Sequence, residues 1–167
     1  MSDGETTFHR EQVNLMNDDI DDIEVIRGFF AEGGTLQALM DIDPNHLDKL
    51  YAYATQLFEA GNYVGAKCYY ELLVRLSHWQ FDYWFALGLT YQKLSEHGEA
   101  ARCFGRAGVL RLSDPRPPYL AGLSYQLMGH GEAAAKAFSA SMKWCSDKPE
   151  YAELKREVEN HASRSIQ

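Results

Sequence analysis

The sequence has few basic residues and no long apolar runs, and each shortage excludes a class of protein. Lysine and arginine total 16 against 24 aspartates and glutamates, which gives a formal net charge of −8. This charge repels the phosphates of nucleic acids and the head groups of anionic lipids. No apolar stretch approaches the roughly 18 residues that a membrane-spanning helix needs, and the first residues are acidic where a signal peptide is basic. We therefore expect a cytoplasmic protein that neither binds nucleic acid nor inserts into a membrane.

The residue patterns of catalytic and metal sites are also missing. Three cysteines have no CxxC spacing, and six histidines are scattered without an HxxxH pair or a Cys/His cluster of zinc spacing. The glycine-rich stretch GHGEAAAK at 129–136 lacks the GK[ST] ending of a phosphate-binding loop. The sequence thus predicts a protein that is not an enzyme and has no metal site and no cofactor.

The pattern of apolar residues changes along the chain, and hydrophobic residues form 46% of it, which is enough for a core. Residues 1–18 are polar without repeated apolar spacing, so we expect a disordered tail. Residues 19–46 combine acidic residues with apolar residues at helical spacing, which predicts an N-terminal helical region. Residues 149–167 open with Pro149 and predict a C-terminal capping helix and tail.

Between these regions the chain repeats itself with a period of 34 residues. The three units are residues 47–80, 81–114 and 115–148. Small residues recur at two positions of the unit, and large residues recur at two others. The recurring residues are Ala54, Gly88 and Gly122; Ala66, Ala100 and Ala134; Leu57, Tyr91 and Tyr125; and Tyr70, Phe104 and Phe138.

This spacing is the tetratricopeptide signature, in which two antiparallel helices form each unit. The small residues permit the two helices of a hairpin to approach closely, and the aromatic residues fill the space against the next hairpin. Gly61, Ser95 and Gly129 fall at the turn inside each unit. We therefore predict an all-α fold, an α-solenoid of three tetratricopeptide hairpins with an N-terminal helical region and a C-terminal capping helix.

Stacked hairpins of this kind leave a concave groove lined by the first helix of each unit. Three positions of the repeat point into this groove, and they carry aromatic, apolar and amide side chains. Such a groove accepts apolar side chains of an extended peptide. The alternative is that the aromatic rings only pack against neighbouring helices. The predicted groove residues are Tyr51, Phe85 and Tyr119; Thr55, Leu89 and Leu123; and Phe58, Gln92 and Gln126.

Two short stretches add more specific information than the repeat. FFAEGGTLQALMDI precedes the first unit, and a P-R-x-P-[FY] run formed by Pro115, Arg116, Pro118 and Tyr119 opens the third unit. With the repeats, they make residues 20–160 resemble the class II chaperones of bacterial type III secretion, which are tetratricopeptide proteins.

This resemblance implies a non-enzymatic chaperone of the bacterial cytoplasm. Its clients would be the hydrophobic translocator proteins, which it keeps soluble, apart from one another and competent for secretion. An extended segment of the client would occupy the groove. The resemblance assigns groove aromatics to Tyr51, Phe58 and Tyr63, with Phe85 and Tyr119 at equivalent positions.

The resemblance also implies further partners. Family members often form homodimers through the N-terminal helical region, which here carries Ile23, Ile26, Phe29 and Phe30. Packing of these residues onto the first hairpin is an equal alternative. Some members also act with a transcription activator, and this sequence does not decide that role.

The chain departs from the family pattern at the third unit, where Pro117 adds a further proline. We therefore expect the first helix of that unit to begin late.

A general tetratricopeptide scaffold or co-chaperone, not tied to secretion, is the competing interpretation. A groove that clamps a terminal carboxylate needs lysine, asparagine and arginine at its lining positions. Here the corresponding positions include Asp48 and Asp82 beside aromatic and apolar residues. The charge of the groove therefore argues against a carboxylate clamp.

Overall fold

The computed structural model describes residues 24–146 and 148–164, and all regular secondary structure within them is helical. The predicted tail 1–18 and the candidate dimer residue Ile23 lie outside the described part. The chain divides into two units, residues 1–42 and 43–167, each of which is described by itself. In the described part, no helix has the length and apolar character to cross a membrane.

The described part of the first unit contains two short helices. Residues 24–31 are helical, and Gly33 follows this helix with a φ of 91°, a left-handed conformation that glycine adopts without strain. Thr35 then caps α2 (Leu36–Leu39), since its Oγ1 accepts a hydrogen bond from the backbone N–H of Ala38 at 3.2 Å. This order of helix, glycine turn and capped helix matches the expected N-terminal helical region.

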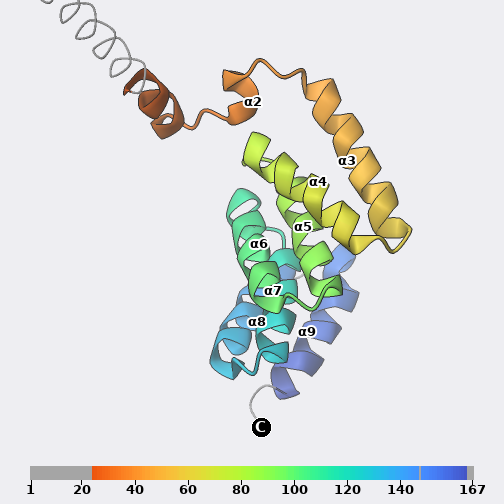
Figure 1. The fold of residues 1–167 in the computed structure, drawn as a ribbon. Coiled ribbons are helices and arrows are strands. Elements are labelled where there is room, and N and C mark those ends of the chain that lie inside the picture. The colour runs from red at the N-terminus through yellow and green to blue at the C-terminus, as the bar shows by residue number, and fades with distance from the viewer. Residues whose placement is uncertain (1–23, 147, 165–167) are drawn as a thin grey trace, which may run out of the picture. The chain divides into compact units, whose positions relative to one another are not determined.

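The second unit consists of helices that follow one another with short turns (Figure 1). Their bounds are α3 (Pro44–Glu59), α4 (Tyr63–Leu76), α5 (Phe81–Lys93), α6 (His97–Leu110), α7 (Arg116–Leu127), α8 (Gly131–Cys145), the 3-10 turn η1 (Pro149–Tyr151) and α9 (Ala152–Arg164).

Each helix of this unit packs mainly against its neighbours in the sequence. Helices α3 and α4, α5 and α6, and α7 and α8 form three hairpins, and α4 with α5 and α6 with α7 join one hairpin to the next. Helix α9 packs on α8 and, to a smaller extent, on α7, so it covers the end of the third hairpin. The predicted fold class, an α-solenoid of helical hairpins with a capping helix, is confirmed. The exact repeat boundaries stay a prediction.

Small residues lie where the helices of a hairpin come closest. Ala54 and Ala66 are completely buried in the first hairpin. In the second, a Cβ added to Gly88 would lie 2.6 Å from the ring of Phe104. In the third, the corresponding atom on Gly122 would lie 2.5 Å from the ring of Phe138. The glycines therefore make room for the aromatic rings of the partner helix in the same hairpin, whereas the repeat pattern assigned these rings to the space against the next hairpin.

Helix α7 corrects one expectation. It begins at Arg116, directly after Pro115, and is not delayed by Pro117. Pro117 and Pro118 lie in its first turn, where the backbone N–H has no partner within the helix, so proline costs nothing there. The turn is also fixed from α8, because the hydroxyl of Ser141 donates to the carbonyl oxygen of Pro115 at 2.8 Å.

Candidate functional site

Five of the ten predicted groove residues line one hollow of about 270 Å³ between α3, α4 and α5. Its lining is mainly apolar and aromatic, and the volume fits one or two side chains of a partner. The predicted residues are Tyr51, Thr55, Phe58, Phe85 and Leu89, and the structure adds Glu59, Tyr70 and Ala86.

Hydrogen bonds and ring contacts fix the α3 wall and the α4 side of this hollow. The hydroxyl of Thr55 donates to the carbonyl oxygen of Tyr51 at 2.9 Å, so the Tyr70 hydroxyl, 3.0 Å away, donates to Thr55. The ring of Tyr51 lies 5.7 Å from that of Tyr70 and 5.4 Å from that of Tyr83, centroid to centroid. Burial raises the pKa of Tyr51 and of Tyr70, so both hydroxyls stay protonated and uncharged near neutral pH.

Aromatic contacts also hold the walls on α3 and α5. The Phe85 ring stacks on Phe81 with centroids 5.3 Å apart and meets the buried Phe104 edge to face at 5.8 Å. On the other side, the rings of Phe58 and Tyr63 meet edge to face at 5.2 Å. Tyr63 therefore supports the hollow through Phe58, although it does not line it. Rings held from two sides form a preformed apolar surface, which costs little entropy when a ligand binds.

The predicted groove residues of the third hairpin lie apart from this hollow, against α9. Tyr119 is only 9% exposed, and its ring lies 6.2 Å from that of Phe138 and 6.1 Å from that of His161. Burial and a hydrogen bond to Glu157 raise the pKa of Tyr119 to about 12. Leu123 packs at the edge of the same cluster, which Val158 of α9 completes. The capping helix therefore covers the part of the predicted groove that α7 contributes.

The two predicted groove amides make hydrogen bonds within the protein. The side-chain nitrogen of Gln92 donates to the carbonyl oxygen of Leu120 at 3.0 Å and to the hydroxyl of Ser124 at 2.9 Å, so it joins α5 to α7. The side-chain oxygen of Gln126 lies 3.1 Å from Nδ1 of His161. Gln92 thus has both N–H groups engaged before any ligand arrives.

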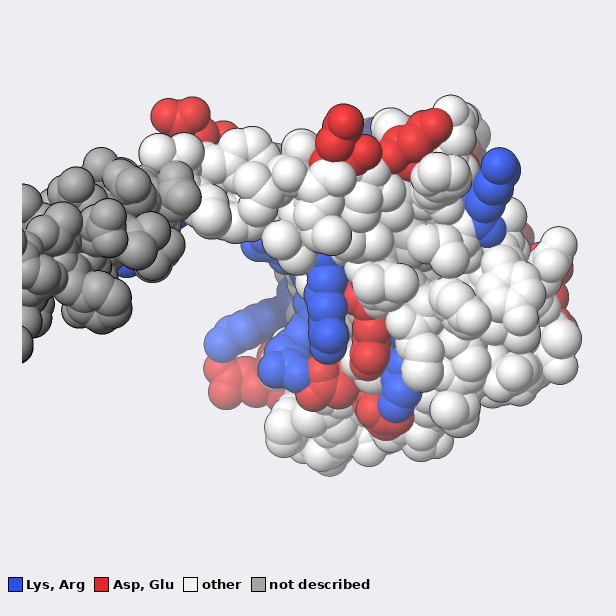
Figure 2. Space-filling view, turned by 45° about the horizontal axis from the view of Figure 1, so that its top comes forward, with Lys and Arg blue, Asp and Glu red and all other residues white. Residues whose placement is uncertain are grey.

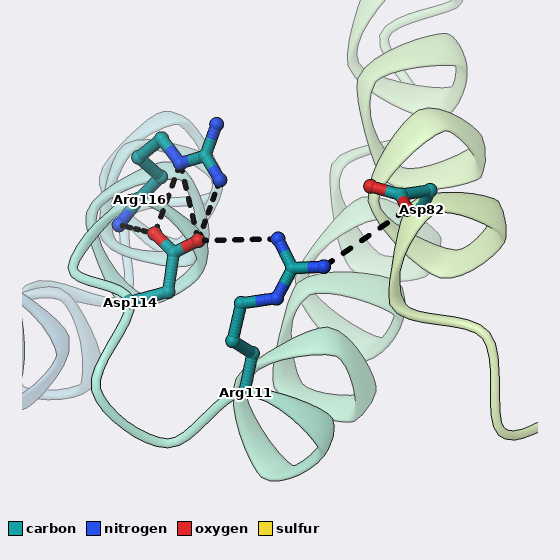
Figure 3. A network of polar contacts seen from close by, with 4 residues as sticks. All are labelled: Asp82, Arg111, Asp114 and Arg116. Carbon is teal, nitrogen blue, oxygen red and sulfur yellow. Dashed lines mark hydrogen bonds and ion pairs between the residues drawn. The ribbon is translucent and has the colours of Figure 1, made fainter.

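A charged network lies where α6 leads into α7 (Figure 3). Its arginines lie beside the rings of Phe81 and Phe85. Asp114 is only 4% exposed, and its carboxylate accepts hydrogen bonds from Nη2 of Arg116 at 2.6 Å and from Nε of the same side chain at 2.9 Å. Arg111 lies between Asp114 and Asp82, at 4.0 Å and 3.9 Å. Burial opposes ionisation of Asp114, but Arg116 outweighs it and lowers the pKa of this carboxyl.

A second hollow, of about 410 Å³, lies between α4, α5 and α6 and has a different character. Arg75, Arg102 and Arg106 line it together with Glu71 and Glu99, and Glu71 accepts a hydrogen bond from the Tyr91 hydroxyl at 2.6 Å. Acidic and basic side chains are interleaved in the same way on part of the face shown in Figure 2. Such mixed charge offers no continuous basic surface for a nucleic acid.

No cluster of three or more potential metal ligands occurs among the described residues. The cysteines are free thiols, of which Cys103 and Cys145 are buried and Cys68 is exposed. Burial raises the pKa of Cys103 to about 12, so this thiol is a poor nucleophile.

Sequence reasoning did not place Tyr70 and Glu59 at the site. The sequence did contain an indication of Tyr70. At two positions of the repeat the first unit has a threonine and a tyrosine, whereas the other two units have a leucine and a phenylalanine. Thr55 and Tyr70 are the residues whose hydroxyl groups meet in the hollow. Glu59 is the last residue of α3, and no repeated residue type marks its position.

No family profile matches the chain, but individual relatives do. It is 25% identical over 133 residues to the low calcium response locus protein H of Yersinia pseudotuberculosis, covering 80% of this chain and 79% of that protein. It is 26% identical over 115 residues to the chaperone protein SicA of Salmonella dublin, covering 69% and 70%.

Comparison with solved structures finds the same group of proteins as comparison of sequences. A type III secretion complex from Aeromonas hydrophila superposes with a TM-score of 0.81 at 26% identity, over 86% of this chain and 95% of the other. The Yersinia enterocolitica chaperone SycD, in complex with a peptide of the translocator YopD, superposes with a TM-score of 0.71 at 22% identity, over 75% and 95%. The resemblance to type III secretion translocator chaperones is confirmed.

Relatives named as chaperones perform a non-enzymatic task, which is consistent with the shortage of catalytic residue patterns in this sequence. At 22% identity the likeness to SycD shows a common fold. The role of the hollow in this chain therefore depends on its own residues.

Proposed function

We propose that this protein is a type III secretion chaperone of the bacterial cytoplasm that is not an enzyme. It binds hydrophobic translocator proteins through an extended segment in its groove and keeps them soluble, apart and competent for secretion. Supporting this proposal is the preformed apolar hollow formed by Tyr51, Thr55, Phe58, Phe85 and Leu89. It holds five of the ten groove residues that the repeat pattern and the family resemblance select.

The size of the hollow sets the expected affinity. At about 270 Å³ it is smaller than a typical drug-sized site of roughly 300–1,000 Å³. Each apolar side chain that it buries contributes about 1.5–3 kcal/mol, and ordering an extended segment costs about 2–5 kcal/mol. A short segment alone therefore binds weakly. We expect a tight complex only where the client also contacts the protein outside the hollow.

The test is co-expression with the proteins encoded beside this gene, followed by measurement of soluble complex. Phe85→Asp places a carboxylate in the apolar lining, and we expect it to weaken binding by at least tenfold, or about 1.4 kcal/mol. Phe85→Ala removes the ring without adding charge and serves as the milder variant. Val109→Asp, at an exposed position of α6 that does not line the hollow, is the matched control.

Circular dichroism and thermal melting must show that each variant is folded. Loss of binding in both Phe85 variants, with the control unchanged, supports the groove as the client site. Full binding by a folded Phe85→Asp protein shows that clients do not use this hollow.

The first unit offers a candidate self-association surface, and we propose that it mediates homodimer formation. Phe29 packs on Gly34, where an added Cβ would overlap the ring. Ile26 and Phe30 remain exposed in the same unit, together with Val25. Exposed apolar residues on adjoining positions of one helix are typical of protein contact surfaces.

A further inference from the structure

The hollow carries a free carboxylate on its α3 side. Glu59 lines the hollow at the C-terminal end of α3, is exposed to solvent, and has no ion-pair partner among the described residues. Burial raises the pKa of Tyr70, the Thr55 hydrogen bond lowers it, and Glu59 raises it further. The Glu59 carboxylate therefore acts electrostatically on the aromatic lining where a client side chain would lie.

A cation lies beside the Phe85 ring, which is part of the α5 wall of the hollow. The guanidinium carbon of Arg116, on α7, is 5.2 Å from the centroid of the Phe85 ring, whose side chain lines the hollow. Asp114 holds this guanidinium through Nε and Nη2, while Nη1 makes none of these bonds and is directed away from the carboxylate in Figure 3. About half of the Arg116 side chain is exposed. Arg116 is thus a positioned cation with donors left for a ligand.

The network holds Arg111 and Arg116 against Asp82 and Asp114, so its charges balance, and Nη1 of Arg116 is the donor that the bonds to Asp114 leave for a ligand. Asp82 and Asp114 both lie near Arg111, which is therefore balanced by carboxylates on two sides. Beyond Arg116, α9 covers Tyr119 and the third hairpin. Arg116 therefore lies next to the Phe85 wall of the open hollow, and Glu59 lies on its α3 wall.

We propose that Glu59 and Arg116 fix the direction in which an extended client segment lies in the hollow. The segment places a lysine or arginine near Glu59 and an aspartate or glutamate near Arg116, with its apolar side chains between them. This inference rests on the proposed function, since it assumes that the hollow binds an extended segment. It adds a charge order that the apolar lining by itself does not specify.

The expected effect is moderate because both charges are exposed to solvent. An exposed ion pair changes an equilibrium constant by about 1.5- to fivefold. Reversing the charge order of a bound segment replaces attraction by repulsion at both ends. We therefore expect about a tenfold difference in affinity between the two orders at low salt, and a smaller difference at high salt, where exposed charges are screened.

The experiment is a phage-display selection of twelve-residue peptides on the full-length protein, so that no client need be known. Wild type, Glu59→Lys and Phe85→Asp are used as baits. The control bait is Glu159→Lys, which makes the same change of charge at an exposed position of α9 that does not line the hollow. On wild type we expect peptides with an apolar centre, a basic flank and an acidic flank, always in one order along the peptide.

Glu59→Lys should select peptides that have lost the basic flank and kept the acidic one, whereas Glu159→Lys should select the same peptides as wild type. One selected peptide and its charge-swapped counterpart, of identical composition, are then compared by fluorescence anisotropy. An apolar centre without a fixed charge order, or an order that Glu59→Lys leaves unchanged, overturns the inference and leaves the proposed function standing. Peptides without an apolar centre, or equal selection by Phe85→Asp, instead overturn the proposed function.

Discussion

Gly88 and Gly105 are both glycines inside helices, yet the structure predicts opposite effects when each is replaced by alanine. An alanine Cβ at Gly88 would lie 2.6 Å from Cε1 of Phe104 and 2.9 Å from Cδ1 and Cζ. Carbon atoms in contact are normally about 3.5–4.0 Å apart. Phe104 is 1% exposed and its ring also contacts Phe85, so it has no free space to enter. At Gly105, apart from the adjoining residues and the backbone of its own helix, no atom lies within 4 Å of the added Cβ.

The magnitudes follow from two opposing contributions. Alanine is more favourable than glycine in a helix interior by about 0.5–1 kcal/mol, which both substitutions gain. Overpacking a full core costs about 1–3 kcal/mol, which only Gly88→Ala incurs. We expect Gly88→Ala to lose about 1–2 kcal/mol, which lowers the Tm by about 2–8 °C for a chain of this length. Gly105→Ala should raise the Tm by about 1–4 °C.

Thermal and urea denaturation followed by circular dichroism provide the measurement, with the two variants as controls for each other. Gly88→Ala should also weaken peptide binding, because a displaced Phe104 ring moves Phe85 in the hollow. If Gly88→Ala is as stable as wild type or more stable, close approach of α5 to Phe104 is not the reason for glycine at this position. Equal destabilisation by Gly88→Ala and Gly105→Ala would show that the space around the added Cβ does not decide the effect.

Three further predictions concern stability, thiol accessibility and self-association. The folded-state pKa of Asp114 is below its unfolded value of about 3.9, so its ionisation stabilises the fold above about pH 4 and this contribution is lost as the pH falls through the folded pKa. Asp114→Asn should remove this acid-dependent loss of stability and should lower the free energy of unfolding at pH 7 by roughly 1–3 kcal/mol, less than for a fully buried pair because Arg111 and Arg116 are half exposed. Urea denaturation from pH 2 to 7 measures both effects. If stability falls with acid in the variant as it does in wild type, Asp114 is not the group responsible. Among the three thiols, only Cys68 is exposed, so an aromatic disulfide reagent should label one thiol quickly in the native protein and three in denaturant; fast labelling of two native thiols would show that Cys103 or Cys145 is accessible. Ile26→Asp with Phe30→Asp should lower the mass measured by light scattering if the first unit mediates a homodimer, and a mass equal to wild type would remove that role.

The sequence predicted the hairpin array well because its determinants are local and repeated. A period of 34 residues with small and aromatic residues at fixed positions fixes which helices pair and where they approach. Gly88 and Gly122 lie at the predicted close approach of two helices, but the rings that they contact, Phe104 and Phe138, belong to their own hairpins, whereas the pattern assigned these rings to the next hairpin. The left-handed turn residues Gly61, Ser95 and Gly129 likewise lie where the pattern placed them.

The candidate site was predicted only in part, because position in the repeat defines the face of a helix and not what covers that face. Tyr51 and Phe85 lie at the predicted hollow, whereas Tyr119, at the same repeat position, is covered by α9. The position of Gln92 in the repeat likewise does not reveal that its amide forms a hydrogen bond that joins α5 to α7. Both outcomes depend on contacts between residues at least 28 positions apart in the sequence.

By itself, therefore, the sequence determined the helical hairpins, their order and the apolar character of the groove, since these follow from local spacing and composition. Tertiary structure alone decided how much of the groove stays open and where its charges lie. Those features arise when α9 packs on the third hairpin and when Asp114 orients Arg116 beside Phe85. Such contacts join segments whose meeting depends on the folded geometry of the whole array, which no local pattern specifies.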